Sequence, residues 1–454
     1  MTQCTQSHFE FKGHFSQQVV ARFDGGTISS DGGSLLLRET DRRLNLLPRF
    51  AACFLDGRAQ GRVEHSVLEM VSQRVYGLAL GYEDVTDHEP LRKDPLFGVL
   101  TGREELDKPL AGKSTLNRLE LGHGRQDRYQ KITFWKEGID ELLVSAFVES
   151  HEKPPEQIIL DIDTTDLTLH GHQEGRFFHG YYDSYCYLPL YVFCGEHVLC
   201  ARLRPSNTDA FAGSLAEIRR IIGQIRAAWP EVKIILRGDS GFCRNELMSW
   251  CEGNRVEYVF GLARNQRLRR IIGRAMWEAT EQWNRTGQPS RVFTEFRYQT
   301  RPTKKRGWDR ERRVVAKAEH LDGKENPRFV VTSLTGEEWA AQALYEELYC
   351  ARGDMENRLK EQFSLFADRV SAETMRANQL RLYFSVMAYV LVSGLRRLGL
   401  KATEWAQAQV ATIRTKLLKI GAQIRVSVRK VWISMASSYP WQALYQQVWS
   451  NLRC

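Results

Sequence analysis

The spacing of hydrophobic and polar positions changes several times along the chain, and each spacing predicts a different element. In 66–80 apolar residues recur at helical intervals, with Gln73 and Arg74 on the polar side. From 158 onward, short apolar runs of strand length alternate with helical periods. The expected strands are 158–169, 187–193, 197–203, 232–236 and 258–262, and the expected helices between them are 214–228 and 245–252.

Three consecutive strands followed by alternating helices and strands predict an α/β fold with a ribonuclease H-like core, in which the first and fourth strands are neighbours. A mainly β insertion subdomain is expected to interrupt this core. The expected domains are a mostly helical N-terminal DNA-binding domain (1–150), a first core part (151–263), a basic β-rich insertion (264–328), a last core part with a strand and a long helix (329–395) and a basic C-terminal tail (396–454). The helices of the first domain suit either DNA reading or a simple scaffold role.

Outside the core, the patterns predict further elements at both ends of the chain. Residues 1–24 show no period and predict an extended arm, whereas Ser29 to Gly33 reads as the cap of a helix that continues to about Leu46. Near the C-terminus, 424–433 alternates like a strand.

Acidic residues stand at the ends of two expected strands. Asp161 and Asp163 are two apart and share one face of the first strand, and Asp239 follows the fourth strand at a glycine turn. Carboxylates on neighbouring strands suit a pair of divalent metal ions. A strand-end acid is also a common turn former or helix cap. The residues alone do not rank Asp161 against Asp163.

Composition narrows the class of protein. A net charge of +9 and a pI near 9.0 are typical of polyanion binders. The apolar runs are too short or too interrupted to cross a bilayer, and no secretory signal opens the chain, so a cytoplasmic protein without membrane contact is expected. Nine cysteines without a Cys-x-x-Cys pair argue against a disulfide framework or a structural zinc site. The segment 396–430 holds nine lysines and arginines against one acid, which suits a phosphate-facing surface.

Three motifs in order carry a resemblance to a known family. Asp163-Thr164-Thr165, Arg237-Gly238-Asp239-Ser240 and Tyr349-x-x-Arg352-x-x-x-Glu356 resemble the catalytic signatures of bacterial insertion-sequence DDE transposases. The whole chain resembles the insertion-sequence family numbered thirteen-eighty, through the further motifs Asp31-Gly32-Gly33, Gln73-Arg74-Val75-Tyr76-Gly77 and Gly180-Tyr181-Tyr182.

The resemblance implies a site and a reaction. Asp163, Asp239 and Glu356 would be the catalytic and metal-binding triad, and the family pattern prefers Asp163 over Asp161. The triad would hold two Mg²⁺ ions, with Mn²⁺ as a substitute. The expected activity is cleavage and strand transfer at the ends of an insertion sequence. Partners would be double-stranded DNA, both terminal inverted repeats and target, and a second copy of the chain in a homodimeric synaptic complex.

The resemblance also implies DNA contacts. Tyr349 and Arg352 are expected near the cut phosphate, with local packing on their helix as the alternative. The lysine that usually follows the glutamate by seven residues is replaced by Phe363, so Lys360, one turn after Glu356, is the nearest candidate for that contact.

A basic loop in the insertion offers a further set of expected contacts. Trp308 lies close after Lys304, Lys305 and Arg306, and similar transposases stack such an aromatic on a flipped base. A buried core tryptophan is the alternative. His170 and His172 share a strand face but lack a third metal ligand at the usual spacing, so structural roles are expected.

Other functions remain open from the sequence. A nuclease with the same core could cut without joining, and an inactive relic could bind DNA only. A helix-turn-helix repressor would leave the α/β core without a use.

Overall fold

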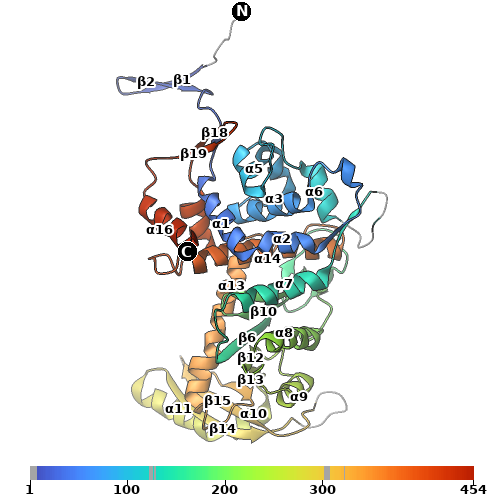
Figure 1. Ribbon diagram of the computed structural model, residues 1–454. Helices are drawn as coiled ribbons and strands as arrows, with labels where there is room; N and C mark the ends of the chain where they lie inside the picture. The colour runs from blue at the N-terminus through green and yellow to red at the C-terminus, as the bar shows by residue number, and fades with distance from the viewer. Residues whose placement is uncertain (1–7, 122–125, 127–128, 301–306, 322, 454) are drawn as a thin grey trace, which may run out of the picture. The chain divides into compact units, whose positions relative to one another are not determined.

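The computed structural model describes residues 8–121, 126, 129–300, 307–321 and 323–453. The chain forms two compact units (Figure 1). The helical unit contains the described residues of 1–120, 125–133 and 387–454, and the sheet unit contains those of 134–386. The N-terminal and C-terminal regions therefore belong to the same unit, and the sheet unit begins ahead of the domain boundary expected at residue 150.

The sheet unit is organised around one large mixed sheet of nine strands. Its order is β11-β10-β6-β12-β13-β17-β15-β14, with the short β16 paired to β15. β6 runs parallel to β12, and β12 runs parallel to β13, whereas the other pairs are antiparallel. The strands are β6 (Gln157–Thr164), β10 (Leu190–Cys194), β11 (His197–Arg202), β12 (Lys233–Gly238), β13 (Val256–Leu262), β14 (Ser290–Tyr298), β15 (Arg312–Leu321), β16 (Lys324–Glu325) and β17 (Arg328–Thr332).

The two faces of the sheet are covered by different helices. Ile158, Leu160 and Ile162 of β6 lie in one buried cluster with α7 (Lys136–Glu149), α8 (Ser214–Ala228) and α9 (Asn245–Gly253). Because side chains alternate along a strand, Asp161 and Asp163 face the opposite side. There Ile235, Val259 and Val330 pack against Leu344 and Leu348 of the late helix. The alternation expected from the sequence thus places both acids under that helix.

The segment 264–328 differs from the separate β subdomain that was expected. Its strands β14 and β15 continue the central sheet through β17. The basic amphipathic stretch before them forms α10 (Gln266–Ile271) and α11 (Gly273–Thr286), whose apolar residues join the same buried cluster as α8 and α9. β17 pairs with β13 on one side and with β15 on the other. The backbone groups of β17 therefore have partners on both sides, whereas a separate β14–β15 sheet would leave them unpaired along one side.

The late helix has an irregular middle. It begins as α12 (Ala341–Ala343), widens into a π-helical segment η4 (Leu344–Tyr349), tightens into a 3₁₀ turn η5 (Cys350–Arg352) and continues as α13 (Gly353–Phe363). Such π segments are rare and often mark functional sites. Here Tyr349 and Arg352 stand at the ends of the two irregular turns.

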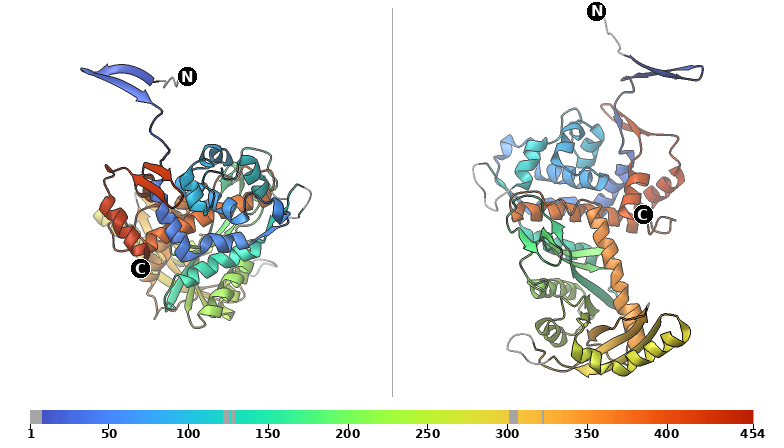
Figure 2. Two further views of the ribbon diagram at one scale, coloured as in Figure 1. Left: turned by 45° about the horizontal axis from the view of Figure 1, so that its top comes forward. Right: turned by 180° about the vertical axis from the view of Figure 1, so that it is seen from behind.

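The helical unit is built from short helices and small sheets. The 3₁₀ turn η1 (Gly32–Ser34) precedes α1, where the cap motif was expected. The helices are α1 (Leu35–Leu44), α2 (Leu46–Ala52), α3 (Val67–Leu80), α4 (His88–Leu91), α5 (Pro95–Thr101), α6 (Lys113–Glu120), α15 (Val410–Ile413) and α16 (Gln442–Arg453), and α14 (Met375–Leu398) contributes residues to both units. The expected N-terminal arm is a two-stranded hairpin, β1 (His8–His14) and β2 (Gln17–Arg22) (Figure 2).

Small strands complete both units. In the sheet unit β7 (Leu167–Thr168), β8 (Phe177–His179) and β9 (Ser184–Tyr187) form a three-stranded sheet. In the helical unit β4 (Phe54–Asp56) pairs with β5 (Ile132–Phe134).

The polar side expected for α3 is buried instead. Gln73 donates from Nε2 to the carbonyl oxygen of Ala111 at 2.9 Å, and Arg74 donates from Nε to Glu120 Oε1 at 2.5 Å. These internal partners hold both side chains inside the unit, although Gln73 Oε1 has no hydrogen-bond partner in the described part of the chain, and residues 69–80 of α3 are all buried. The expected amphipathic helix is therefore present, but its expected exposed side was wrong.

Asp41 predicts a pH-dependent stability of the helical unit. Burial raises the pKa of Asp41 to about 6, against hydrogen bonds from the backbone of Leu47 and Leu46 that act to lower it. A raised carboxyl pKa means that stability falls as the pH rises from about 4 through 6, because only the folded state still holds the proton there. Asp41→Asn keeps an acceptor for Leu47. Its stability gain over wild type should grow by about 2 kcal/mol between pH 4.5 and pH 7 in urea titrations. A gain that is equal at both pH values would contradict this reading.

Among the residues that the structure describes, every helix is too short or too polar to cross a bilayer.

Candidate functional site

The parallel register of β6 and β12 brings two acids together at the carboxyl-terminal ends of these central strands, which are called the sheet edge below. Gly238 lies opposite Ile162 in this register, and the next residues of the two strands are Asp239 and Asp163. Burial raises the pKa of Asp163 to about 6, Arg352 opposes that rise, and the negative charge of Asp239 adds to it. The two carboxylates therefore share one electrostatic environment.

Each of these acids uses one oxygen for a local turn. Asp163 Oδ1 accepts from the backbone nitrogen of Thr164 at 2.9 Å, and Asp239 Oδ1 accepts from that of Gly241 at 2.8 Å. A Cβ at Gly241 would lie 2.9 Å from Asp239 Oδ1, so a larger residue there would push the Asp239 carboxylate out of its place. Asp239 Oδ2 has no hydrogen-bond partner among the described residues. The turn-former role weighed above is thus present, but it occupies only half of each carboxylate.

Asp161 is engaged differently from Asp163. Arg237 donates to both of its oxygens, at 2.5 Å and 2.7 Å, and also donates to the carbonyl oxygen of Leu348 at 2.5 Å. All three groups are buried. The pair ties β6 and β12 to the π-helical segment, and it leaves Asp163 as the acid of this strand with an oxygen toward the sheet edge.

Arg352 lies among the candidate acids. Its Nη2 donates to Asp163 Oδ2 at 2.6 Å. Burial lowers the pKa of Arg352, but the charges of Asp163, Asp239 and Glu356 outweigh that effect and hold the pKa above its ordinary value. Its Nε is buried without a hydrogen-bond partner among the described residues. One guanidinium thus supplies the positive charge at this edge and keeps an unused donor.

Tyr349 packs at the same edge. A Cβ at Gly261 of β13 would lie 2.6 Å from the Tyr349 hydroxyl and 3.0 Å from the backbone nitrogen of Ser240. Burial raises the pKa of Tyr349, and the charge of Asp239 adds to the rise. Glycine at position 261 therefore makes the room in which the phenol lies next to the Asp239 turn.

Glu356 and Lys360 lie on α13, and both are exposed. The charge of Glu356 reaches Arg352. However, no three His, Cys, Asp or Glu side chains in the described part of the chain converge into a group that could hold a metal ion. The structure brings Asp163, Asp239, Tyr349 and Arg352 together, whereas the Glu356 carboxylate is not gathered with the two aspartates.

Tyr182 and Asp166, to which the sequence motifs gave no role in the site, also lie near these acids. Burial raises the pKa of Tyr182 to about 12, and the charges of Asp166, Asp163 and Asp239 add to the rise. The ring of Tyr181 packs edge-on against that of Tyr182 at 5.0 Å. The signal was present in the Gly180-Tyr181-Tyr182 motif, but only the fold shows that this loop lies beside the acids.

The structure places Trp308 in the core. It is 4% exposed, its ring meets that of Tyr298 at 5.7 Å, and its backbone nitrogen donates to Thr300 Oγ1 at 2.8 Å. This burial favours the packing alternative over base stacking. Lys304, Lys305 and Arg306 lie outside the described residues.

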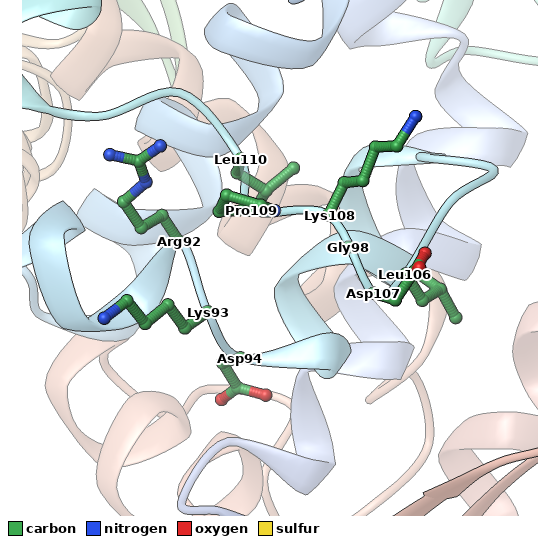
Figure 3. Close-up of a pocket in the computed structure, with 9 residues that line it drawn as sticks. All are labelled: Arg92, Lys93, Asp94, Gly98, Leu106, Asp107, Lys108, Pro109 and Leu110. Carbon is green, nitrogen blue, oxygen red and sulfur yellow. The ribbon is translucent and has the colours of Figure 1, made fainter.

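The two histidines considered as metal ligands and a pocket in the helical unit both lack the candidate acids. His170 and His172 are exposed, and His172 Nδ1 lies 3.3 Å from Arg176. A pocket of about 260 Å³ in the helical unit lies between the turn after α4 and the loop after α5 (Figure 3). Its lining mixes both charge signs: Arg92, Lys93, Asp94, Gly98, Leu106, Asp107, Lys108, Pro109 and Leu110.

A cryo-EM structure of the piggyBac transposase synaptic complex with hairpin DNA resembles this chain with a TM-score of 0.42 and 10% sequence identity, over 94% of this chain and 81% of that one. No curated protein sequence matches this chain. The family described as transposase DDE domain group 1 matches residues 11–454, nearly the whole chain. The chain therefore belongs to the DDE transposase family, group 1.

Proposed function

We propose that this chain cuts the ends of an insertion sequence and joins them to target DNA in a divalent-metal-dependent reaction. The observation that carries the proposal is the meeting of Asp163 and Asp239 on neighbouring parallel strands, with Arg352 between the acids. The strand order supports it as well. Numbered along the chain, the first five core strands lie in the order third, second, first, fourth, fifth, which is the arrangement of a ribonuclease H-like core.

The residues at this edge suit a hard divalent cation. Asp163 and Asp239 offer carboxylate oxygens, the ligands that Mg²⁺ and Mn²⁺ take, and the exposed Glu356 on α13 would have to move to them to complete the set. Asp163 is buried beside a second negative charge, an arrangement that a bound cation would stabilise. When bound, two such ions would supply an activated water or 3′-hydroxyl and stabilise the leaving oxygen.

The chain's own residues would orient the DNA around this edge. The Nε of Arg352 is a buried donor without a partner among the described residues, so we assign Arg352 to the phosphate at the cut. We assign Tyr349, whose hydroxyl lies near Gly261 beside the Asp239 turn, to holding the backbone of that turn. Lys360 lies one helical turn after Glu356 and is exposed, which suits a contact with a neighbouring phosphate. Two copies of the chain would hold the two ends of one element together.

Cleavage of a labelled duplex that carries the end of the element tests the proposal. We expect a cut at the end with Mg²⁺ or Mn²⁺, no cut with excess EDTA, and a joined product when supercoiled target DNA is added. Cutting without any joined product would instead make the chain a nuclease. Binding without cutting in either metal would make it an inactive relic, and either result would overturn the proposal.

A further inference from the structure

We propose that the hairpin formed by β18 (Ala422–Val426) and β19 (Val431–Met435) is a second DNA-binding element, which inserts its tip into a groove of duplex DNA. This inference rests on the proposed function, since it concerns the same substrate. The hairpin belongs to the helical unit, whereas the candidate acids belong to the sheet unit. The sequence pattern predicted one strand over 424–433, but the structure breaks it into two strands joined by a turn.

The base of the hairpin is firmly held. Ala422 and Ile424 are buried, β18 pairs with β3 (Ile28–Ser29), and the nitrogen of Ile424 donates to the carbonyl oxygen of Thr27 at 2.8 Å. A Cβ at Gly32 would come within 2.9 Å of Ala422 Cβ, so the contact with η1 is close. The base of the hairpin is therefore fixed by strand pairing and by buried side chains.

The tip is ordered by its own hydrogen bonds. The backbone nitrogen of Ser427 donates to the carbonyl oxygen of Lys430 at 2.9 Å, and the Ser427 hydroxyl donates to the same oxygen at 2.8 Å. The nitrogen of Lys430 donates back to Ser427 Oγ at 3.1 Å. These bonds close the turn without using the side chains of Val428, Arg429 or Lys430, which all point into solvent as exposed residues. A preformed turn loses little conformational entropy on binding.

The charges of the hairpin have one sign. Arg425, Arg429 and Lys430 are its only ionisable residues between 422 and 435, and in the described part of the chain none of them has an ion-pair partner. Arg425 lies opposite Trp432 in the register, and the ammonium of Lys430 is 5.3 Å from the centre of the Trp432 ring. Unpaired cations on a narrow ribbon complement the closely spaced phosphates of duplex DNA.

The tip of the hairpin also carries an exposed apolar residue, Val428. Val428 is fully exposed at the apex, where no residue that the structure describes covers it. The major groove of DNA admits a two-stranded β-ribbon, and several groove-binding proteins insert an apolar side chain between neighbouring bases. The geometry thus assigns the cations to phosphates and Val428 to the base edges.

Binding of a labelled mixed-sequence duplex over a series of salt concentrations tests the assignment. Arg429→Ala/Lys430→Ala should bind about tenfold more weakly near 0.1 M salt, and the slope of log K against log salt should fall by about 2. The matched control Arg42→Ala/Lys108→Ala removes the same charge from the same unit, at two exposed cations that are already paired with Glu39 and Glu105. It should stay within about twofold of wild type, because paired cations release few counterions.

Two further variants separate the effect of charge at the tip from the effect of side-chain shape. Arg429→Lys/Lys430→Arg should retain the wild-type slope, and Val428→Ser should weaken binding without changing the slope because it alters no charge. Circular dichroism of each variant checks that it is folded. If the alanine pair and its control lose equal affinity, or neither loses any, the hairpin is not a DNA element. Metal-dependent cutting by wild type would then still stand, so that the two proposals fail separately.

Discussion

Asp163→Asn and Asp239→Asn should each lower the rate of metal-dependent cleavage at saturating DNA by about 10³-fold or more. Under the proposed function either change would remove a charged group that holds a metal ion, and metal ions supply several kcal/mol of transition-state stabilisation. Glu356→Gln should behave alike if its exposed side chain joins the aspartates when metal and DNA bind. DNA affinity in EDTA should change little, because the proposed DNA contacts come from Arg352, Lys360 and other cations and not from these carboxylates. Single-turnover cleavage of a labelled end and a binding titration in EDTA measure the two effects.

Asp354→Asn is the matched control for this series. Asp354 is exposed on α13, two residues before Glu356, and the substitution makes the same chemical change without touching the sheet edge. It should cut at close to the wild-type rate. If Asp163→Asn and Asp239→Asn also cut at that rate, the two aspartates are only the acceptors of the Thr164 and Gly241 turns.

Arg237→Ala should lower the free energy of unfolding of the sheet unit by about 3–5 kcal/mol, the usual cost of leaving one member of a buried ion pair alone. The substitution strands the buried carboxylate of Asp161, whose burial already raises its pKa against the opposing effect of Arg237. It also frees the carbonyl oxygen of Leu348 in the π-helical segment. Urea unfolding followed by tryptophan fluorescence and circular dichroism measures the change.

Arg244→Ala provides the comparison for a surface pair. Arg244 reaches Asp209 at 2.9 Å, but both side chains are largely exposed, so its loss should cost less than about 1 kcal/mol. The double variant Asp161→Leu/Arg237→Met should recover much of the stability lost in Arg237→Ala, because no buried charge is left without a partner. Equal losses for Arg237→Ala and Arg244→Ala would show that the buried pair is not structural.

The sequence by itself determined the local elements of the core and the order in which they occur. Apolar runs bounded by turn residues placed β10, β11, β12 and β13 within three residues of their observed bounds, and helical periods placed α8 and α9 within one residue. The first expected strand, 158–169, is divided into β6 and the short β7. The same pattern put Asp161 and Asp163 on one face and Asp239 at a strand end. These features depend on short-range periodicity, which the chain carries in its own spacing.

Tertiary structure alone decided which of these residues meet. Asp161 and Asp163 are equivalent in the strand pattern, yet Arg237 forms a buried ion pair with Asp161, and Arg352 donates a hydrogen bond to Asp163. Trp308 looked like a loop aromatic and is a core residue, and the insertion strands joined the main sheet through β17. Tyr182 lies near the acids although its loop comes about twenty residues after β6 ends. Such contacts join positions far apart in the chain, and no local period records them, because partner choice depends on the packing of the whole unit.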